Sequence, residues 1–297
     1  MKKTRKEYKY PLKWKIFSGI ALVLVCMLLY MDLSHDYGLS DRIGDFFYYG
    51  IRGISYEIRT PDFPHYETEC QQIPEGFWEE NQPCPWWKAA ESWSDADWQQ
   101  AFPGLSEAQM ESLQDLPRGK GEAMSYWSGL KLLGFDVPVK EAKQILEMAD
   151  FDYSVMALRT AAAILEEENL SAKRLREKLG ESGYTPKEIT YALEHCGADW
   201  NFQAVQCLKN TLMHSNASRA GLLRTMTDYE RFTEEEAAYA MGQIEIDYVR
   251  HAQRVSVWLR HKGWSREEIM SELRKDGFQE EEVLKGVSYR WWKFWDS

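Results

Sequence analysis

The sequence predicts an all-α fold, in which a single N-terminal transmembrane helix is followed by an extracellular Trp-rich segment and three tandem three-helix repeats. A unit of 47 to 48 residues recurs in the second half of the chain, with copies that begin at Asp152, Asp199 and Asp247. Inside each copy the apolar residues recur at helical spacing. Near the N-terminus, an uncharged stretch follows a basic tail. A period of this length is typical of arrays whose units bury their cores on one another.

The N-terminal 33 residues predict a signal anchor. Residues 1–15 carry seven Lys/Arg and one Glu, and the positive-inside rule places this tail in the cytoplasm. Residues 16–33 form the predicted span, within which Ile16 to Met31 is uncharged. A cleaved signal peptide is the alternative, but no small-residue cleavage site follows. We expect a single-pass protein of the cell membrane, with most of the chain outside the cell.

The five cysteines fit an extracellular location. Cys26 lies in the predicted span, and the valine before it does not match a lipoprotein signal. The other four are an even number in a compartment that permits disulfides. Proximity in sequence favours pairs of Cys70 with Cys84 and Cys196 with Cys207, one of three connectivities. Four free, buried thiols are the alternative.

Two segments separate the span from the repeats. Residues 34–66 read as a juxtamembrane linker that ends near the break at Thr60-Pro61. Residues 67–150 are acidic and begin with a stretch rich in tryptophan: Trp78, Trp86, Trp87, Trp93 and Trp98. Aromatic rings can stack on sugars, but five tryptophans beside two cysteines are more typical of the core of a small module. Helical spacing in residues 105–116, 121–133 and 138–146 indicates a degenerate copy of the repeat.

The three repeats span residues 151–198, 199–246 and 247–297, and each predicts three helices. In each copy a serine is the expected N-cap of the second helix: Ser171, Ser218 and Ser265. The expected inward residues of the first helices are Ala161, Ile164 and Leu165; Leu208, Thr211 and Leu212; and Val255, Trp258 and Leu259. Those of the second helices are Leu175 and Leu179, Leu222 and Met226, and Ile269 and Leu273. This arrangement has the outline of a helix-turn-helix bundle.

The ends of the second helices and the starts of the third helices also carry signals. Glycine before an aromatic residue, at Gly183 and Gly277, predicts a left-handed turn, and the middle copy is one residue longer here. Capping boxes at Thr185 and Thr233 predict the third helices. After the last helix, the aromatic residues 291–295 are expected to cap the open end of the array, with a membrane or partner contact as the alternative.

The middle copy carries a family resemblance, in residues 198–205 (ADWNFQAV), 218–223 (SRAGLL) and 232–240 (FTEEEAAYA). These stretches resemble the Ltp family of host cell surface-exposed lipoproteins, and the resemblance extends over residues 151–290. It implies tandem three-helix repeats. Members of the family include superinfection exclusion proteins of Gram-positive bacteria, which stop an incoming phage from delivering its DNA. The resemblance implies a protein partner, with a phage tail or tape-measure protein as the specific candidate.

Charge and motif content argue against other classes. Residues 151–290 carry 19 Lys/Arg and 23 Asp/Glu, so they lack the basic face that a nucleic-acid-binding protein needs. No spacing of metal ligands, phosphate-binding loop or nucleophile motif is visible, so we expect no cofactor, no metal and no enzyme activity. A cell-wall hydrolase remains an alternative, because two carboxylates brought together by folding leave no sequence trace.

The expected function is therefore protein binding at the cell surface. Four arginines on the predicted second helices are the candidate contact residues: Arg219, Arg224, Arg266 and Arg274. Superinfection exclusion is the specific version of this expectation. The alternative is an envelope or adhesion module unrelated to phage, which binds cell-wall glycan through the Trp-rich segment.

Overall fold

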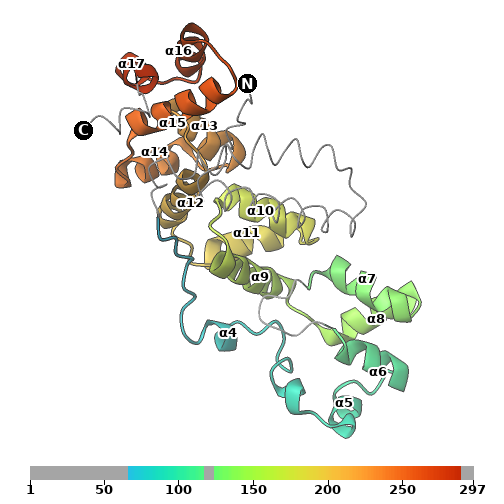
Figure 1. Cartoon of the computed structure of the whole chain (residues 1–297). Helices are drawn as coiled ribbons and strands as arrows, with labels where there is room; N and C mark the ends of the chain where they lie inside the picture. Colours follow the sequence, from blue (N-terminus) through green and yellow to red (C-terminus); the bar gives the residue numbers. More distant parts are fainter. Residues whose placement is uncertain (1–65, 117–123, 289–297) are drawn as a thin grey trace, which may run out of the picture. The chain divides into compact units, whose positions relative to one another are not determined.

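The computed structural model describes residues 66–116 and 124–288, and this part of the chain is all-helical, without β-strands (Figure 1). The predicted cytoplasmic tail, the predicted span and the aromatic residues 291–295 lie outside the described residues. The first half contains α4 (Phe77–Glu80), the 3₁₀ turn η2 (Ala89–Ser92), α5 (Asp95–Ala101), α6 (Glu107–Gln114), α7 (Tyr126–Asp136) and α8 (Val139–Ala149).

The repeats follow as three units of three helices. The first unit is α9 (Tyr153–Glu167), α10 (Ala172–Glu181) and α11 (Pro186–His195). The second is α12 (Trp200–His214), α13 (Arg219–Arg224) with the π-helical turn η3 (Thr225–Tyr229), and α14 (Glu234–Gln243). The third is α15 (Tyr248–His261), α16 (Arg266–Lys275) and α17 (Glu280–Ser288). In every unit the first helix packs closely against the third.

The helices begin where the capping residues predict. Ser171, Ser218 and Ser265 each accept a hydrogen bond from a backbone amide in the first turn of the second helix, as expected. The capping boxes at Thr185 and Thr233 are also present. The aspartate that starts each copy is the N-cap of the first helix. Each such cap satisfies amides that a helix leaves unpaired, and typically contributes about 1 kcal/mol.

The expected core positions of the second helices are confirmed. All six apolar residues that the spacing places inward, on α10, α13 with η3, and α16, are fully buried. The first helices agree except at one position. Trp258 was expected to face inward, but it is 48% exposed and Lys262 lies over its ring. It belongs to the third unit, the last that the structure describes.

A three-helix unit with a similar order of helices precedes the first repeat, but here the second helix packs closely against the third and the first helix does not. It consists of α6, α7 and α8, with Ser106 and Ser125 as the N-caps of its first two helices. The spacing from Ser125 to Ser171 is 46 residues, which is close to the repeat length. Helix α7 begins at Tyr126, five residues later than the apolar spacing predicts, because the helix starts at its serine cap.

Neighbouring units are joined by the same serines that cap the second helices. The Ser125 hydroxyl donates to the Ser182 carbonyl (3.0 Å) and the Ser171 hydroxyl donates to the Glu230 carbonyl (2.6 Å). The Ser218 hydroxyl likewise donates to the backbone carbonyl of Asp276. Each acceptor lies at the C-terminal end of the next unit's second helix. The second helices α7, α10, α13 and α16 therefore form a row in which the N-terminus of each one meets the C-terminus of the next.

The turn after the second helix of each of the three repeats has the left-handed backbone that the sequence predicts for the first and third. Gly183 has φ +90° and Gly277 has φ +94°. In the second unit Arg231 takes this place with φ +64°. The extra residue of the middle copy is absorbed by the π-helical turn η3, in which the Glu230 amide donates to the Thr225 carbonyl (3.0 Å). The insertion therefore leaves the junction with the first unit intact.

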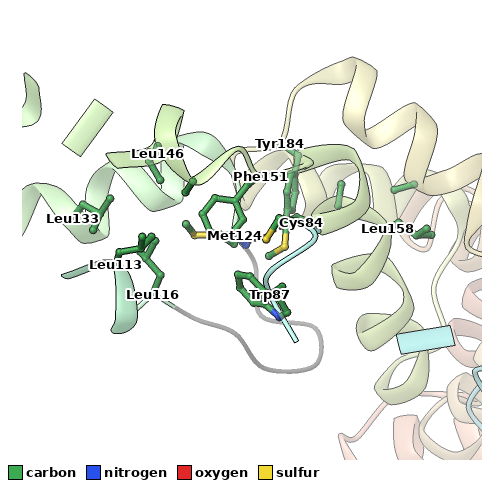
Figure 2. Close-up of a cluster of buried hydrophobic side chains, with 14 of the residues drawn as sticks. Cys84, Trp87, Leu113, Leu116, Met124, Leu133, Leu146, Phe151, Leu158 and Tyr184 are labelled. Atoms are coloured by element: carbon green, nitrogen blue, oxygen red, sulfur yellow. Dashed lines mark hydrogen bonds between the residues drawn. The ribbon is translucent and has the colours of Figure 1, made fainter. Parts of the chain in front are cut away.

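One core cluster extends from the Trp-rich segment through the α6–α8 unit into the first repeat (Figure 2). The tyrosine after Gly183 links two of these parts. The Tyr184 hydroxyl accepts from the Met124 amide (3.0 Å) and is hydrogen-bonded to the Thr160 hydroxyl (2.9 Å). The second and third units have separate core clusters.

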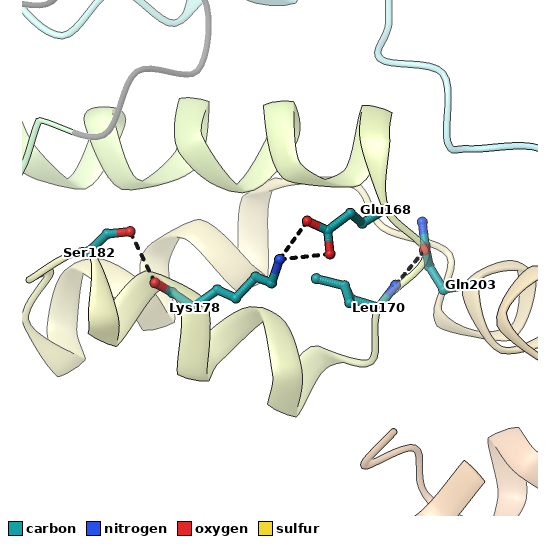
Figure 3. Close-up of polar contacts among 5 residues, drawn as sticks. All are labelled: Glu168, Leu170, Lys178, Ser182 and Gln203. Atoms are coloured by element: carbon teal, nitrogen blue, oxygen red, sulfur yellow. Dashed lines mark hydrogen bonds and ion pairs between the residues drawn. The ribbon is translucent and has the colours of Figure 1, made fainter. Parts of the chain in front are cut away.

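The segment before α4 lies along the first helix of the second unit. The Glu69 amide donates to Gln206 Oε1 (3.1 Å), and Lys209 Nζ donates to the Glu67 carbonyl (3.1 Å). Gln203 Nε2 donates to Gln71 Oε1 (3.3 Å). Gln203, which is fully buried, also accepts from the Leu170 amide (3.1 Å) in the loop between α9 and α10 (Figure 3). Gln203, Gln206 and Lys209, spaced three apart on one face of α12, therefore hydrogen-bond to every second residue of this segment.

Candidate protein-interaction surface

The four arginines predicted to contact a partner are all exposed. Arg219 and Arg224 lie on α13, and Arg266 and Arg274 lie on α16. These two helices meet end to end at the junction between Ser218 and Asp276. The structure therefore places the four residues on two adjoining helices of the second and third units.

Two of the four arginines have partners within the chain. The Arg219 guanidinium lies 4.7 Å from the centroid of the Tyr248 ring. Arg274 makes two hydrogen bonds to the Glu280 carboxylate (2.9 and 2.7 Å). Both groups of this ion pair are about half exposed, so the pair contributes little to stability. A competing carboxylate on a partner could replace Glu280 at low cost.

Arginines on the first helices are used differently. Arg159 is 4% exposed, and its guanidinium donates to the carbonyls of Trp78 (2.8 Å) and Asn81 (3.1 Å). Burial lowers the pKa of Arg159, but a guanidinium stays charged at any physiological pH. Arg254, at the matching place on α15, is 3% exposed and donates to Asn216 Oδ1 (3.2 Å). The first helices thus use arginine inside the protein, whereas α13 and α16 present it to solvent.

The structure also exposes apolar residues that the sequence analysis did not single out. Phe135 is 86% exposed, and Trp127, Leu132 and Val139 are also exposed. Trp127, Phe135 and Val139 line a shallow groove between α7 and α8, together with Leu130, Gly134 and the two lysines Lys131 and Lys143. A second exposed pair, Trp258 and Trp264, lies on the third unit. Contiguous exposed apolar residues of this size mark interaction surfaces more often than isolated ones do.

The tryptophans of residues 67–150 mainly build the interior. Trp87 and Trp98 are almost fully buried. Trp86 is half-buried, with its ring centroid 5.2 to 6.2 Å from those of five other aromatic rings: Trp87, Trp93, Trp98, Phe102 and Phe151. Its indole N–H donates to the Ala149 carbonyl (3.1 Å). These contacts support the interpretation as the core of a module over the interpretation as a platform for sugars.

No disulfide joins Cys70, Cys84, Cys196 and Cys207 in the structure, and all but the half-buried Cys70 are buried, so the arrangement is closer to the alternative of buried thiols. Cys196 packs in the first unit's core cluster and Cys207 in that of the second unit, so the favoured partners face different interiors. Burial raises the pKa of the Cys207 thiol to about 12 and also raises the pKa of the Cys196 thiol. Both are therefore protonated and poorly nucleophilic at neutral pH.

Within residues 66–116 and 124–288, no group of three or more His, Cys, Asp or Glu side chains could hold a metal ion. The buried histidine has a structural contact, because His251 Nδ1 lies 2.9 Å from the Ala217 carbonyl. Burial lowers the pKa of His251, which favours the neutral imidazole.

The described part of the chain contains no helix that is both long and apolar enough to span a membrane, and the predicted span lies outside it. Comparisons with known proteins add no further assignment. No family model, no curated protein and no solved structure matches this chain.

Proposed function

We propose that this protein is a membrane-anchored cell-surface protein that binds another protein through its helical units, and that it acts in superinfection exclusion by blocking the entry of phage DNA. The observation that carries the proposal is the exposure of Arg219, Arg224, Arg266 and Arg274 on α13 and α16. Arginine is enriched at protein interfaces, and here the helices that carry the arginines belong to units with fully buried cores.

The exposed arginines favour a partner with acidic groups. Guanidinium groups bind carboxylates in a bidentate geometry, as Arg274 does with Glu280. The resemblance to the Ltp family suggests a phage tail or tape-measure protein as this partner. The alternative function is binding of cell-wall glycan by the Trp-rich segment, and the internal positions of Trp87 and Trp98 argue against it.

The test is a phage challenge of Gram-positive cells that express the full chain, with adsorption and DNA entry scored separately. We expect normal adsorption and blocked entry for at least one phage of a broad panel. The variant Arg224→Glu should restore entry, whereas the control Lys187→Glu should not. The control makes the same charge change at an exposed residue of a third helix.

Unaffected entry across the panel would refute the exclusion function. A pull-down with purified cell-wall glycan then tests the alternative, because sugar stacking requires the Trp-rich segment. Equal loss of the block in both charge variants would show that the arginines of α13 and α16 have no specific role.

A further inference from the structure

Within residues 66–116 and 124–288, the row of second helices has two ends that no other described unit covers, here called open ends, and each exposes apolar residues. At the three internal junctions the capping serines Ser125, Ser171 and Ser218 are at most 1% exposed, because the next unit covers them. Ser265 caps α16 in the same way but is exposed. Trp264, the residue before it, is 39% exposed, whereas the equivalent residues Met124 and Leu170 are buried.

The other open end is the C-terminus of α7. In the first and third repeats, the acceptor carbonyl lies eleven residues after the serine that caps the same second helix: Ser182 after Ser171, and Asp276 after Ser265. In the α6–α8 unit the residue eleven after Ser125 is Asp136, the last residue of α7. Phe135, immediately before it, is the most exposed large apolar residue of the described chain. The Asp136 carbonyl therefore has the same spacing from its capping serine as the two acceptors, although Asp136 is the last residue of α7 and the acceptors directly follow their helices.

The α7–α8 end is basic, and the third-unit end carries charges of both signs. The groove beside Phe135 is lined by Lys131 and Lys143 and by no carboxylate. The first turn of α16 carries Glu267 and Glu268, which complement these lysines, together with Arg266, and all three are exposed. Opposite charges at the rims of two surfaces favour their association and fix its orientation.

We propose that the third unit of one copy of this protein stacks on the α7–α8 face of a second copy and so continues the row of second helices from chain to chain. Ser265 would then donate to the Asp136 carbonyl of the second copy. Trp258 and Trp264 would pack against the groove that contains Phe135 and Val139. The contact joins two different surfaces, so each copy keeps one open end and can bind a further copy.

This arrangement uses the contact that already joins the units within one chain. It does not depend on the phage-related function, and it leaves Arg219, Arg224 and Arg274 outside the stacking contact. Anchoring of many copies in one membrane would favour such an interaction, because it raises their effective concentration.

The test measures self-association of the full chain in detergent by sedimentation velocity. Phe135→Glu places a carboxylate opposite Glu267, and Trp264→Lys places an ammonium opposite Lys131 and Lys143. Each variant alone should associate at least about tenfold more weakly than the unchanged chain, because a central aromatic contact is lost and like charges meet. The control Tyr239→Glu, at an exposed residue of α14, should associate like the unchanged chain.

Mixing the two variants gives the decisive result. Each variant retains one intact end, so an equimolar mixture should form dimers that neither variant forms alone. Circular dichroism of each variant checks that its helices are retained. A monomeric unchanged chain would overturn the proposal, and would fit coverage of the third unit by residues 289–297 or by another protein. Failure of the mixture to form dimers would also overturn it.

Discussion

Replacing the serine of one junction by alanine should cost more than replacing the same serine at the open end of the array. In Ser218→Ala the first turn of α13 loses its cap, which costs about 1 kcal/mol. The carbonyl of the half-buried Asp276 also loses its donor, which costs about 1 kcal/mol more. We therefore expect the free energy of unfolding to fall by about 2 kcal/mol in total.

Ser265→Ala is the matched control, because Ser265 caps α16 and is exposed, with no described unit packed on it. Its cost should be the cap alone, about 1 kcal/mol. The cost of Ser125→Ala in free energy of unfolding should also be near this value, since the Ser128 hydroxyl still donates to the Ser182 carbonyl (2.8 Å). Urea unfolding of the full chain, followed by circular dichroism at low protein concentration, measures all three. Equal losses for Ser218→Ala and Ser265→Ala would refute the reasoning.

Three further predictions concern single positions. Gly277→Ala should lower the free energy of unfolding by at least about 1 kcal/mol, since the residue has φ +94° and the new Cβ would lie 2.8 Å from a neighbouring alanine Cβ. In the control Gly242→Ala the new Cβ meets no neighbouring atom within 4 Å, so stability should stay unchanged or rise. Urea unfolding compares the two. Tyr184→Phe should cost about 1 to 3 kcal/mol in the same assay, because the buried Met124 amide loses its acceptor. A loss below this range would show that water satisfies the amide. Burial lowers the folded-state pKa of His251, so below about pH 6.5 the unfolded chain binds more protons than the folded chain. The contribution of the neutral His251 to the free energy of unfolding is therefore fully present above this pH and is lost as the pH falls. Unfolding free energies measured from pH 7.5 to 5 should fall less steeply in His251→Gln, and identical slopes would contradict this assignment.

Most of the architecture could be predicted from the sequence because its signals are local. A capping serine and the leucines four and eight residues later are read within one helix, and the structure confirms them at Leu175, Leu179 and Leu222. The boundaries of the third helices follow from capping boxes that span four residues, as at Thr185.

The features that were missed depend on residues far apart in the chain. The acceptor of the Ser171 hydroxyl lies 59 residues away, and only the stacking of two units brings it within reach. The buried role of Gln203 depends on a segment more than 130 residues earlier. Phe135 and Trp258 are exposed on the outermost units that the structure describes, although neither residue differs in type from those inside the core.

The segment Tyr66 to Gln71, held along α12, determines how the array would respond to mechanical force. Tension applied through the residues before Tyr66 would load this segment in shear along α12 before it reached α4 or the Trp-rich core. The bonds of Gln206 and Lys209 to the backbone of Glu69 and Glu67 would bear it in parallel. Bonds loaded together in shear resist more force than bonds opened one after another. The second unit would thus carry the load first, and the first unit would be shielded until this segment detached.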